Sequence, residues 1–205
     1  RNTRIYDSAR QQIAWVNALS NRTTYVVDAI GRREAIVNSV GDRTSLVFDA
    51  LTQLVAIVDP IGNRTSFSYD VRGNRYEKET SLGFRTTTLY DEMNREIAVV
   101  TPVGARSTSV YDAIGRLVSS VNPLGQRTTA TYGFSGKLVS LTNPLGNRTT
   151  YAYDAIGNKI SQVNPLGERT TVVYDEASRA IASVDAKGSR WTTLYDQADR
   201  AIASV

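Results

Sequence analysis

The feature that most constrains this chain is an aspartate that recurs every 21 residues. The aspartates of this column are Asp7, Asp28, Asp49, Asp70, Asp91, Asp112, Asp154, Asp175 and Asp196. The single interval of 42 residues is divided by Gly133, which stands in the same register directly after Tyr132. A constant period of this length predicts one array of ten repeats over residues 1–205, rather than one or two globular domains.

Further columns run in phase with the aspartate. The preceding residue is aromatic in nine of ten repeats: Tyr6, Phe48, Tyr69, Tyr90, Tyr111, Tyr132, Tyr153, Tyr174 and Tyr195. Six residues before the aspartate stands an arginine in every repeat: Arg1, Arg22, Arg43, Arg64, Arg85, Arg106, Arg127, Arg148, Arg169 and Arg190. All five prolines stand eleven residues after the aspartate column, and glycine stands thirteen residues after it in eight of nine repeats.

Each repeat predicts two short strands and two tight turns. Residues 148–153 typify the first strand and residues 116–121 the second, because both are rich in β-branched or aromatic residues. Residues 112–115 typify what we call the Asp turn, and residues 122–125 the Asn-Pro turn. Both fit a type I turn with Asp or Asn first and Gly last. We expect the Asp to cap its turn and to face a cation four residues on, as Asp112 faces Arg116.

Turns this short reverse the chain and therefore predict an all-β meander of antiparallel hairpins. One hairpin is marginal in water, so stacked hairpins supply the stability. The apolar columns do not follow strict period two, which indicates a bulge or burial on both faces. Such a sheet is expected to coil into a spiral shell or tube, or to pack against other copies. A parallel β-helix is the main structural alternative, and a leucine-rich repeat a weaker one.

The tyrosine and arginine columns are the candidate site residues. The favoured interpretation of Tyr69, Tyr90, Tyr111, Tyr153, Tyr174 and Tyr195 is a packing ladder, and the alternative is a row of aromatic platforms for sugars. Ten like charges in the arginine column require neutralisation or exposure. We expect Arg22 through Arg190 to bond carbonyls or the Asn or Asp of the adjacent turn, with binding of acidic polymers as the alternative.

Two repeats depart from the pattern. Glu77, Lys78 and Glu79 replace small and apolar residues of a second strand, and mark either a diverged repeat or an exposed edge or contact site. Gly133-Phe134-Ser135-Gly136 replaces an Asp turn and is expected to keep the turn at little cost.

Composition excludes several kinds of chemistry. The chain holds no Cys and no His, which excludes disulfides, thiolate metal sites, Cys nucleophiles and His-based acid–base catalysis. One carboxylate per turn is too few for a Ca²⁺ site, and nothing singles out a catalytic pair. We therefore expect no enzyme, no metal and no cofactor. Nearly equal numbers of acids and bases, 20 and 24, argue against nucleic acid as a partner.

The unit resembles the RHS/YD repeat family, which is named for its Tyr-Asp pair. The matching motifs are Tyr111-Asp112-Ala113-Ile114-Gly115-Arg116-Leu117, Tyr153-Asp154-Ala155-Ile156-Gly157-Asn158 and Asn122-Pro123-Leu124-Gly125. The resemblance implies large bacterial or teneurin-like secreted and surface proteins whose hairpins spiral into a hollow β-shell. In bacteria that shell commonly encloses a toxin, and other members mediate surface contact, some with carbohydrate. The self-cleaving plug of toxin-enclosing members has no counterpart here, so no catalytic residue is carried over.

These observations together predict a non-enzymatic wall segment of a shell, tube or filament, outside the cell or at its surface. The alternatives are the encapsulating shell of a toxin and an adhesion or carbohydrate-binding array. Neither end of the sequence carries a capping motif, so we expect a segment of a longer array or one whose ends meet other copies. Expected partners are further repeats or copies of itself, glycans, or an enclosed toxin.

Overall fold

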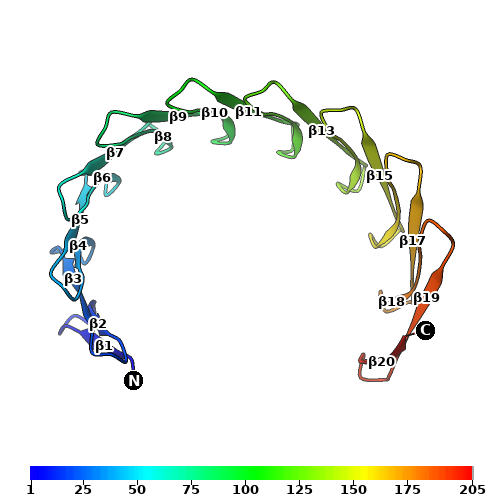
Figure 1. Cartoon of the computed structure of the whole chain (residues 1–205), viewed down its shortest axis with the longest axis horizontal. Helices are drawn as coiled ribbons and strands as arrows, with labels where there is room; N and C mark the ends of the chain where they lie inside the picture. Colours follow the sequence, from blue (N-terminus) through cyan, green and yellow to red (C-terminus); the bar gives the residue numbers. More distant parts are fainter. Residues whose placement is uncertain (205) are drawn as a thin grey trace. The chain divides into compact units, whose positions relative to one another are not determined.

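The computed structural model describes residues 1–204 and divides into two compact units, Arg1–Arg106 and the residues from Ser107 onward. Val205, the last residue of the predicted array, lies outside the described residues. Figure 1 shows that each unit consists of successive β-hairpins, with the two kinds of turn on opposite edges of the sheet. The predicted all-β array of antiparallel hairpins is confirmed.

The strands repeat with the sequence period. Unit 1 holds β1 (Thr3–Tyr6), β2 (Gln12–Val16), β3 (Arg22–Val27), β4 (Arg33–Val37), β5 (Arg43–Phe48), β6 (Leu54–Val58), β7 (Arg64–Tyr69), β8 (Arg75–Glu79), β9 (Arg85–Tyr90) and β10 (Glu96–Val100). The later strands are β11 (Arg106–Tyr111), β12 (Leu117–Val121), β13 (Arg127–Tyr132), β14 (Leu138–Thr142), β15 (Arg148–Tyr153), β16 (Lys159–Val163), β17 (Arg169–Tyr174), β18 (Ala180–Val184), β19 (Arg190–Tyr195) and β20 (Ala201–Ser204). From β3 onward, first strands begin at the arginine column and mostly end on the aromatic residue, while second strands begin after the Asp turn.

Every hairpin built on an Asp turn contains the same irregularity. In the pair β11–β12, Val110 lies opposite Ser119 but Tyr111 lies opposite Leu117, so Val118 is the extra residue of a β-bulge. The same shift occurs at the last residue of β1, β3, β5, β7, β9, β13, β15, β17 and β19. The bulge moves the second strand out of strict alternation, which explains why its apolar columns differ in parity.

The two kinds of turn share one backbone geometry. In the Asp turn of Asp112, the Gly115 N–H donates to the Asp112 carbonyl and the Asp112 N–H donates to the Arg116 carbonyl, at 3.0 and 2.9 Å. The Asn-Pro turn that starts at Asn122 repeats both bonds with Gly125 and Gln126. The fourth residue has positive φ, 89° at Gly115 and 76° at Gly125. Each connection is therefore a type I turn closed by a left-handed residue, which extends the predicted four-residue turn by one position.

The most buried residues form a column of small side chains in the second strands. Ala14, Ala35, Ala56 and Ala98 in unit 1 and Ser119, Ser140, Ser161 and Ala182 later in the chain are at most 6% exposed. Each lies seven residues after the aspartate column and pairs with residues of the strands on both sides, as Ser119 does with Val110 and Thr129. In a single-layer sheet this column of small, buried side chains takes the place of a conventional core.

The two repeats that depart from the sequence pattern, at Glu77–Glu79 and at Gly133, both keep the regular fold. The interpretation of Glu77, Lys78 and Glu79 as an exposed edge is wrong, because β8 pairs with β7 on one side and β9 on the other. The turn of Gly133 keeps both backbone bonds of the Asp turns, at 2.9 and 3.0 Å, so the loss of the aspartate leaves the backbone geometry intact.

Candidate functional site

The aspartate column organises the Asp turns. Asp112 Oδ1 accepts hydrogen bonds from the backbone N–H groups of Ile114 and Arg116, at 3.1 and 2.9 Å, and its Oδ2 accepts from Arg116 Nε at 2.6 Å. The expected cation pair therefore forms, and it recurs in the ion pairs Asp28–Arg32, Asp91–Arg95, Asp175–Arg179 and Asp196–Arg200, each at 2.7 Å. One carboxylate thus caps its turn and fixes the position of a cation.

These contacts lower the pKa of several aspartates of the column. At Asp112 the backbone N–H of Arg116 is the largest cause of the lowered pKa, and the Arg116 guanidinium adds to it while desolvation opposes both. The pKa values of Asp28, Asp70, Asp91, Asp175 and Asp196 are also lowered, in each case mainly by hydrogen bonds from the residue four positions on. The charged form is therefore the one that these turns are built around.

The cation of one repeat covers the aromatic ring of the next. The Arg116 guanidinium carbon lies 4.7 Å from the centre of the Tyr132 ring, and Arg179 lies 5.1 Å from that of Tyr195. Arg32 covers Phe48 at 4.8 Å in the same way. Because the aspartate positions the arginine, a chain of Asp, Arg and aromatic ring joins each such repeat to its successor.

The tyrosine hydroxyls make a second link between repeats. The hydroxyl donates to the backbone carbonyl fifteen residues earlier, at the start of the preceding second strand. The pairs are Tyr69–Leu54, Tyr90–Arg75, Tyr132–Leu117, Tyr153–Leu138, Tyr174–Lys159 and Tyr195–Ala180, at 2.9–3.4 Å. Tyr111 is half-buried like the other tyrosines of its column from Tyr69 onward. This geometry is that of the predicted packing ladder, and it uses the hydroxyls that a sugar platform would offer to a ligand.

The arginine column is exposed and bonds side-chain hydroxyls. Nε of Arg22, Arg43 and Arg64 donates to the Ser or Thr hydroxyl two residues on, at 3.2–3.3 Å. Arg127 instead reaches back with Nη1 to the Oγ of Ser119, in the buried small-residue column, at 3.0 Å. Arg106, Arg148, Arg169 and Arg190 are exposed as well. The partners of Arg22, Arg43, Arg64 and Arg127 are hydroxyls, and not the carbonyls or the Asn or Asp of the turn that the sequence predicts.

The acidic substitutions in β8 are matched by the arginine of the next strand. Arg85 lies 3.9 Å from Glu77 and 3.3 Å from Glu79, and Lys78 between them is exposed. Glu77 occupies the small-residue column, where Arg127 meets Ser119 in a later repeat. The arginine column can therefore neutralise a charge placed there, which accounts for how this diverged repeat keeps its fold.

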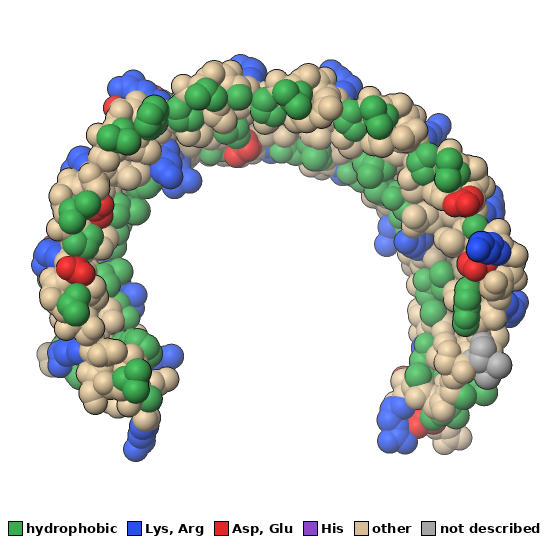
Figure 2. Space-filling model, viewed as in Figure 1, with side chains coloured by type: hydrophobic (Ala, Val, Ile, Leu, Met, Phe, Trp, Pro, Cys, Tyr) green, Lys and Arg blue, Asp and Glu red, His purple; other side chains and the backbone are tan. Residues whose placement is uncertain are grey.

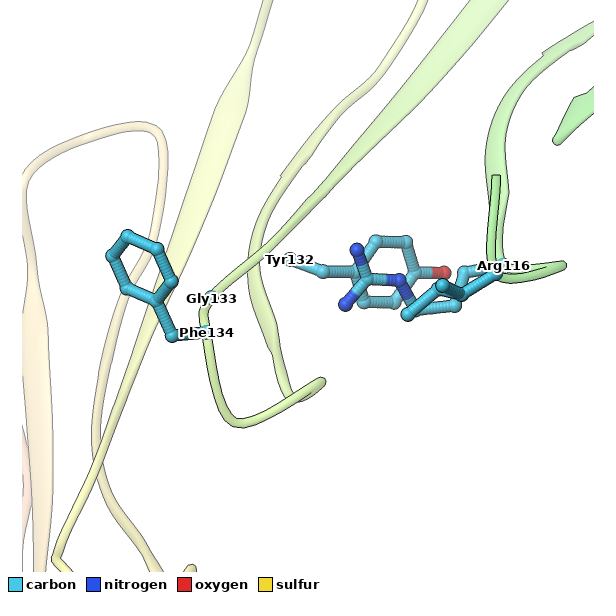
Figure 3. A pocket seen from close by; sticks show the side chains of 5 residues that line it. Arg116, Tyr132, Gly133 and Phe134 are labelled. Carbon is cyan, nitrogen blue, oxygen red and sulfur yellow. The ribbon is translucent and has the colours of Figure 1, made fainter. Parts of the chain in front are cut away.

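An open pocket of about 370 Å³ lies beside the turn that has lost its aspartate. Its lining comprises Ile114, Arg116, Tyr132, Gly133 and Phe134. Figure 3 shows the Arg116 guanidinium over the Tyr132 ring, while Phe134 points away from both. The charge of Arg116 is balanced by Asp112, so the pocket offers an apolar wall and no free charge.

Among residues 1–204, no three Asp or Glu side chains cluster closely enough to hold a metal ion. The described part of the chain also lacks a helix that is long and apolar enough to cross a membrane.

Sequence reasoning missed three features of this arrangement. The first is the buried small-residue column, which the sequence shows as Ala or Ser at a fixed position of the repeat. The second is the stacking of cations on the next aromatic ring, which depends on how the hairpins pair. The third is the exposed aliphatic residue of the turns, which recurs in the sequence at a constant spacing. Only the first and third left a direct signal in the sequence.

Comparisons with known proteins agree with this description. The model of the RHS repeat family matches residues 48–82 in unit 1 and 135–169 in unit 2. No curated protein matches the chain. The crystal structure of TcdB2-TccC3-TEV is similar with a TM-score of 0.67 and 17% identity, over 99% of this chain and 14% of that one. A Tc holotoxin pore of Photorhabdus luminescens is similar with a TM-score of 0.57 and 15% identity, over 89% of this chain and 13% of that one.

At such identities these two structures establish the fold alone, and this chain spans less than a fifth of either. The sequence match to the RHS repeat covers one stretch in each unit, about a third of the chain. This chain is therefore similar to RHS-repeat proteins in the sequence of those residues and in its fold.

Proposed function

We propose that the chain is a non-enzymatic structural module, a stretch of β-sheet wall in a large secreted or cell-surface RHS-repeat protein. The observation that carries the proposal is that the recurring side chains bond to other parts of the same sheet. The aspartate, the cation and the tyrosine bond the turn, the next ring and the previous strand, so the regular features of the sequence serve to hold hairpin to hairpin.

The finer form of the proposal is a wall that encloses cargo, such as a toxin. Its support is the fold shared with TcdB2-TccC3 and Tc holotoxin structures, together with the shell that the family resemblance implies. A sheet with half-buried residues on both faces suits a wall that has an inside and an outside.

Electron microscopy of the native assembly that contains this chain tests the proposal. The wall function predicts a hollow body or tube whose surface is a continuous sheet of these repeats. An assembly in which the repeats form an isolated strip, with no enclosed volume, would refute it.

Carbohydrate binding is the second candidate, because some aromatic side chains are open to solvent. Trp191 is 48% exposed and Tyr76 is 40% exposed. Glycan-array binding by the wild type that is lost in Trp191→Ala would support an adhesive role. Unchanged binding in that variant would argue against these rings as platforms.

A further inference from the structure

The turn that starts at Gly133 differs from every other described turn in its hydrogen bonding. In each of the others the backbone N–H of the fifth residue donates to a side-chain oxygen of the first. Gln126 donates in this way to Asn122 Oδ1 at 3.0 Å, and Phe84 to Thr80 Oγ1 at 3.2 Å. Glycine has no side chain, so within residues 1–204 the N–H of Lys137 is the one such donor that lacks this acceptor.

The preceding Asp turn shows what binds at this position. Asp112 accepts two backbone N–H groups at Oδ1 and Arg116 Nε at Oδ2. The equivalent donors in the turn of Gly133 are the N–H groups of Ser135 and Lys137 and the Lys137 ammonium, which we call the Gly133 site. Both backbone bonds of an Asp turn are kept here, so the two N–H groups are already oriented for one carboxylate oxygen.

The surroundings of the Gly133 site are positively charged. Residues 113–153 contain no acidic residue, and their cations are Arg116, Arg127, Lys137 and Arg148. Lys137 is exposed and forms no ion pair with any of residues 1–204, and its Nζ lies 6.0 Å from the centre of the Tyr153 ring. Figure 2 shows cationic side chains spread over the visible face of unit 2, with hydrophobic groups between them. This field attracts an anion, and the charge of Lys137 is available to pair with it.

The cation of the preceding repeat adds to the field. Arg116 Nη1 lies 4.0 Å from the point that a Cβ on Gly136 would occupy, so its guanidinium borders the turn. The same relation exists at Asp196. The pKa of that carboxyl is lowered mainly by hydrogen bonds from Arg200, and the charge of Arg179 in the preceding repeat lowers it further. A carboxylate in the Gly133 site is therefore stabilised from two repeats.

An apolar surface adjoins the Gly133 site. The open pocket of about 370 Å³ described above borders Gly133 itself. Its lining includes the exposed side chains of Ile114 and Phe134 and the ring of Tyr132 (Figure 3). This volume exceeds the roughly 150 Å³ of a cavity that holds benzene. The arrangement suits an acid with a small aromatic or aliphatic body.

We propose that the turn of Gly133 binds a small carboxylate ligand with an apolar body. One carboxylate oxygen accepts from the N–H groups of Ser135 and Lys137, the other faces the Lys137 ammonium, and the body lies against Ile114 and Phe134. The ligand thus replaces the aspartate side chain that this repeat lacks. The inference does not depend on the wall function, so either can fail without the other.

Selective ¹⁵N-labelling of lysine reports on the site, because the chain holds only four lysines, Lys78, Lys137, Lys159 and Lys187. Titration with sodium phenylacetate is expected to move the Lys137 amide resonance until it saturates. The resonance of Lys187 should stay in place, because its N–H already donates to Asp185 Oδ1 at 2.9 Å. Phenylacetamide keeps the ring but has no charge, and should bind about tenfold more weakly. An unmoved Lys137 resonance, or equal binding of acid and amide, would overturn the proposal.

Gly133→Asp fills the site from within the chain. A Cβ at Gly133 meets Val139 first, and Asp112 precedes Val118 by the same six residues, so circular dichroism should be unchanged. Phenylacetate should no longer bind to this variant. Leu145→Asp is the charge-matched control, because it adds the same charge at an exposed position on the opposite edge of the sheet and should bind like the wild type. Undiminished binding by Gly133→Asp would overturn the proposal.

Two further probes define the ligand. Acetate lacks the apolar body and should need about tenfold higher concentrations than phenylacetate, and equal affinities would overturn the assignment of the pocket. Acetyl-aspartyl-phenylalaninamide offers the same carboxylate on a peptide. If it moves the Lys137 resonance at lower concentrations than phenylacetate, the ligand is an acidic protein segment, and the reverse order assigns a free organic acid.

Discussion

At the scale of the residue, the fold depends on a few positions whose chemistry the turn dictates. The fourth residue of each turn has positive φ and is usually glycine, but Arg10, Thr52, Asn94, Ser178 and Asp199 occupy it in five Asp turns. Thr52 is the least suited of these, because a β-branched side chain crowds the left-handed conformation.

Thr52→Gly is therefore expected to stabilise the protein. Relief of strain at φ 67° should outweigh the greater freedom of glycine in the unfolded chain and leave a net gain of roughly 0.5 kcal/mol. The midpoint of urea unfolding measures the change. The converse substitution, Gly62→Thr at φ 90°, has open space for a side chain and should lower the midpoint by backbone strain alone. A gain from both substitutions would contradict this account.

Three of the capping aspartates, Asp28, Asp112 and Asp175, predict a dependence of stability on acid. Their pKa values are lowered in the folded state, so their stabilisation is complete above the ordinary value of 3.8 and is lost as the pH falls through the lowered values. The melting temperature should thus fall on acidification below about pH 4. The triple variant Asp28→Asn, Asp112→Asn, Asp175→Asn keeps an acceptor oxygen but cannot titrate, and its melting temperature should fall less steeply than that of the wild type. Parallel curves would refute the linkage.

The buried small-residue column distinguishes two serines. Ser161 Oγ is buried without a hydrogen-bond partner, whereas Ser119 Oγ accepts from Arg127. Ser161→Ala should raise stability by roughly 1 kcal/mol, because the variant removes an unsatisfied polar group. Ser119→Ala is the matched control and should be neutral or destabilising. Both are measured by chemical unfolding, and equal effects would show that the hydrogen bond of Ser119 contributes nothing.

At the scale of the element, hairpins are joined by side chains that cross from one repeat to the next. The tyrosine ring lies under the cation of the preceding repeat, and its hydroxyl bonds the first residue of that repeat's second strand. Neither contact exists within a hairpin built on an Asp turn, because both join the strands on either side of an Asn-Pro turn. The contacts of the Tyr column therefore depend on neighbouring repeats, and the spacing between strands determines which groups each tyrosine contacts.

Tyr153 allows these two contacts to be separated. Tyr153→Phe loses the bond to the Leu138 carbonyl, 2.9 Å long, but keeps the ring beneath Lys137, and should cost about 1 kcal/mol. Tyr153→Leu loses the ring as well and should cost more. The free energy of unfolding measured in urea gives both values. Identical losses would show that the ring itself adds nothing.

At the scale of the whole molecule, the repeat makes the chain a sum of similar hairpins. Each described strand pairing joins strands that are neighbours in the sequence, so stability is expected to depend on local repeats and their interfaces. A change in the number of repeats should then be tolerated, whereas a change in their phase should not.

Deletions test this expectation directly. Removal of residues 133–153 joins Tyr132 to Asp154 and keeps every column in register, so the shortened chain should fold with the same circular dichroism per residue. Removal of residues 133–152 shifts the pairing by one residue and turns the following strand to its other face. The second deletion should lose its cooperative transition in thermal melting. If both shortened chains melt with the same cooperativity, the register of the repeats does not determine the structure.

The sequence by itself determined the strand order, the turns and the period. Punctuation about every ten residues leaves room only for short strands, and Asp, Pro and Gly specify the turn chemistry locally. It also predicted the ion pair of Asp112 and Arg116, because a turn of fixed length holds both. The exposed-edge interpretation of Glu77 failed because pairing on both sides of a strand depends on neighbours that the local sequence does not name.

Only the tertiary structure decided what crosses between hairpins. The bulge before the aromatic column, the cation over the next ring and the burial of Ala or Ser depend on the register between strands, which is set by the sheet as a whole. The same holds for the two edges, where Leu145 and Ile114 look like ordinary turn residues until their exposure is seen. A repeat in the sequence fixes which residues recur, and the spacing of strands in space fixes what those residues touch.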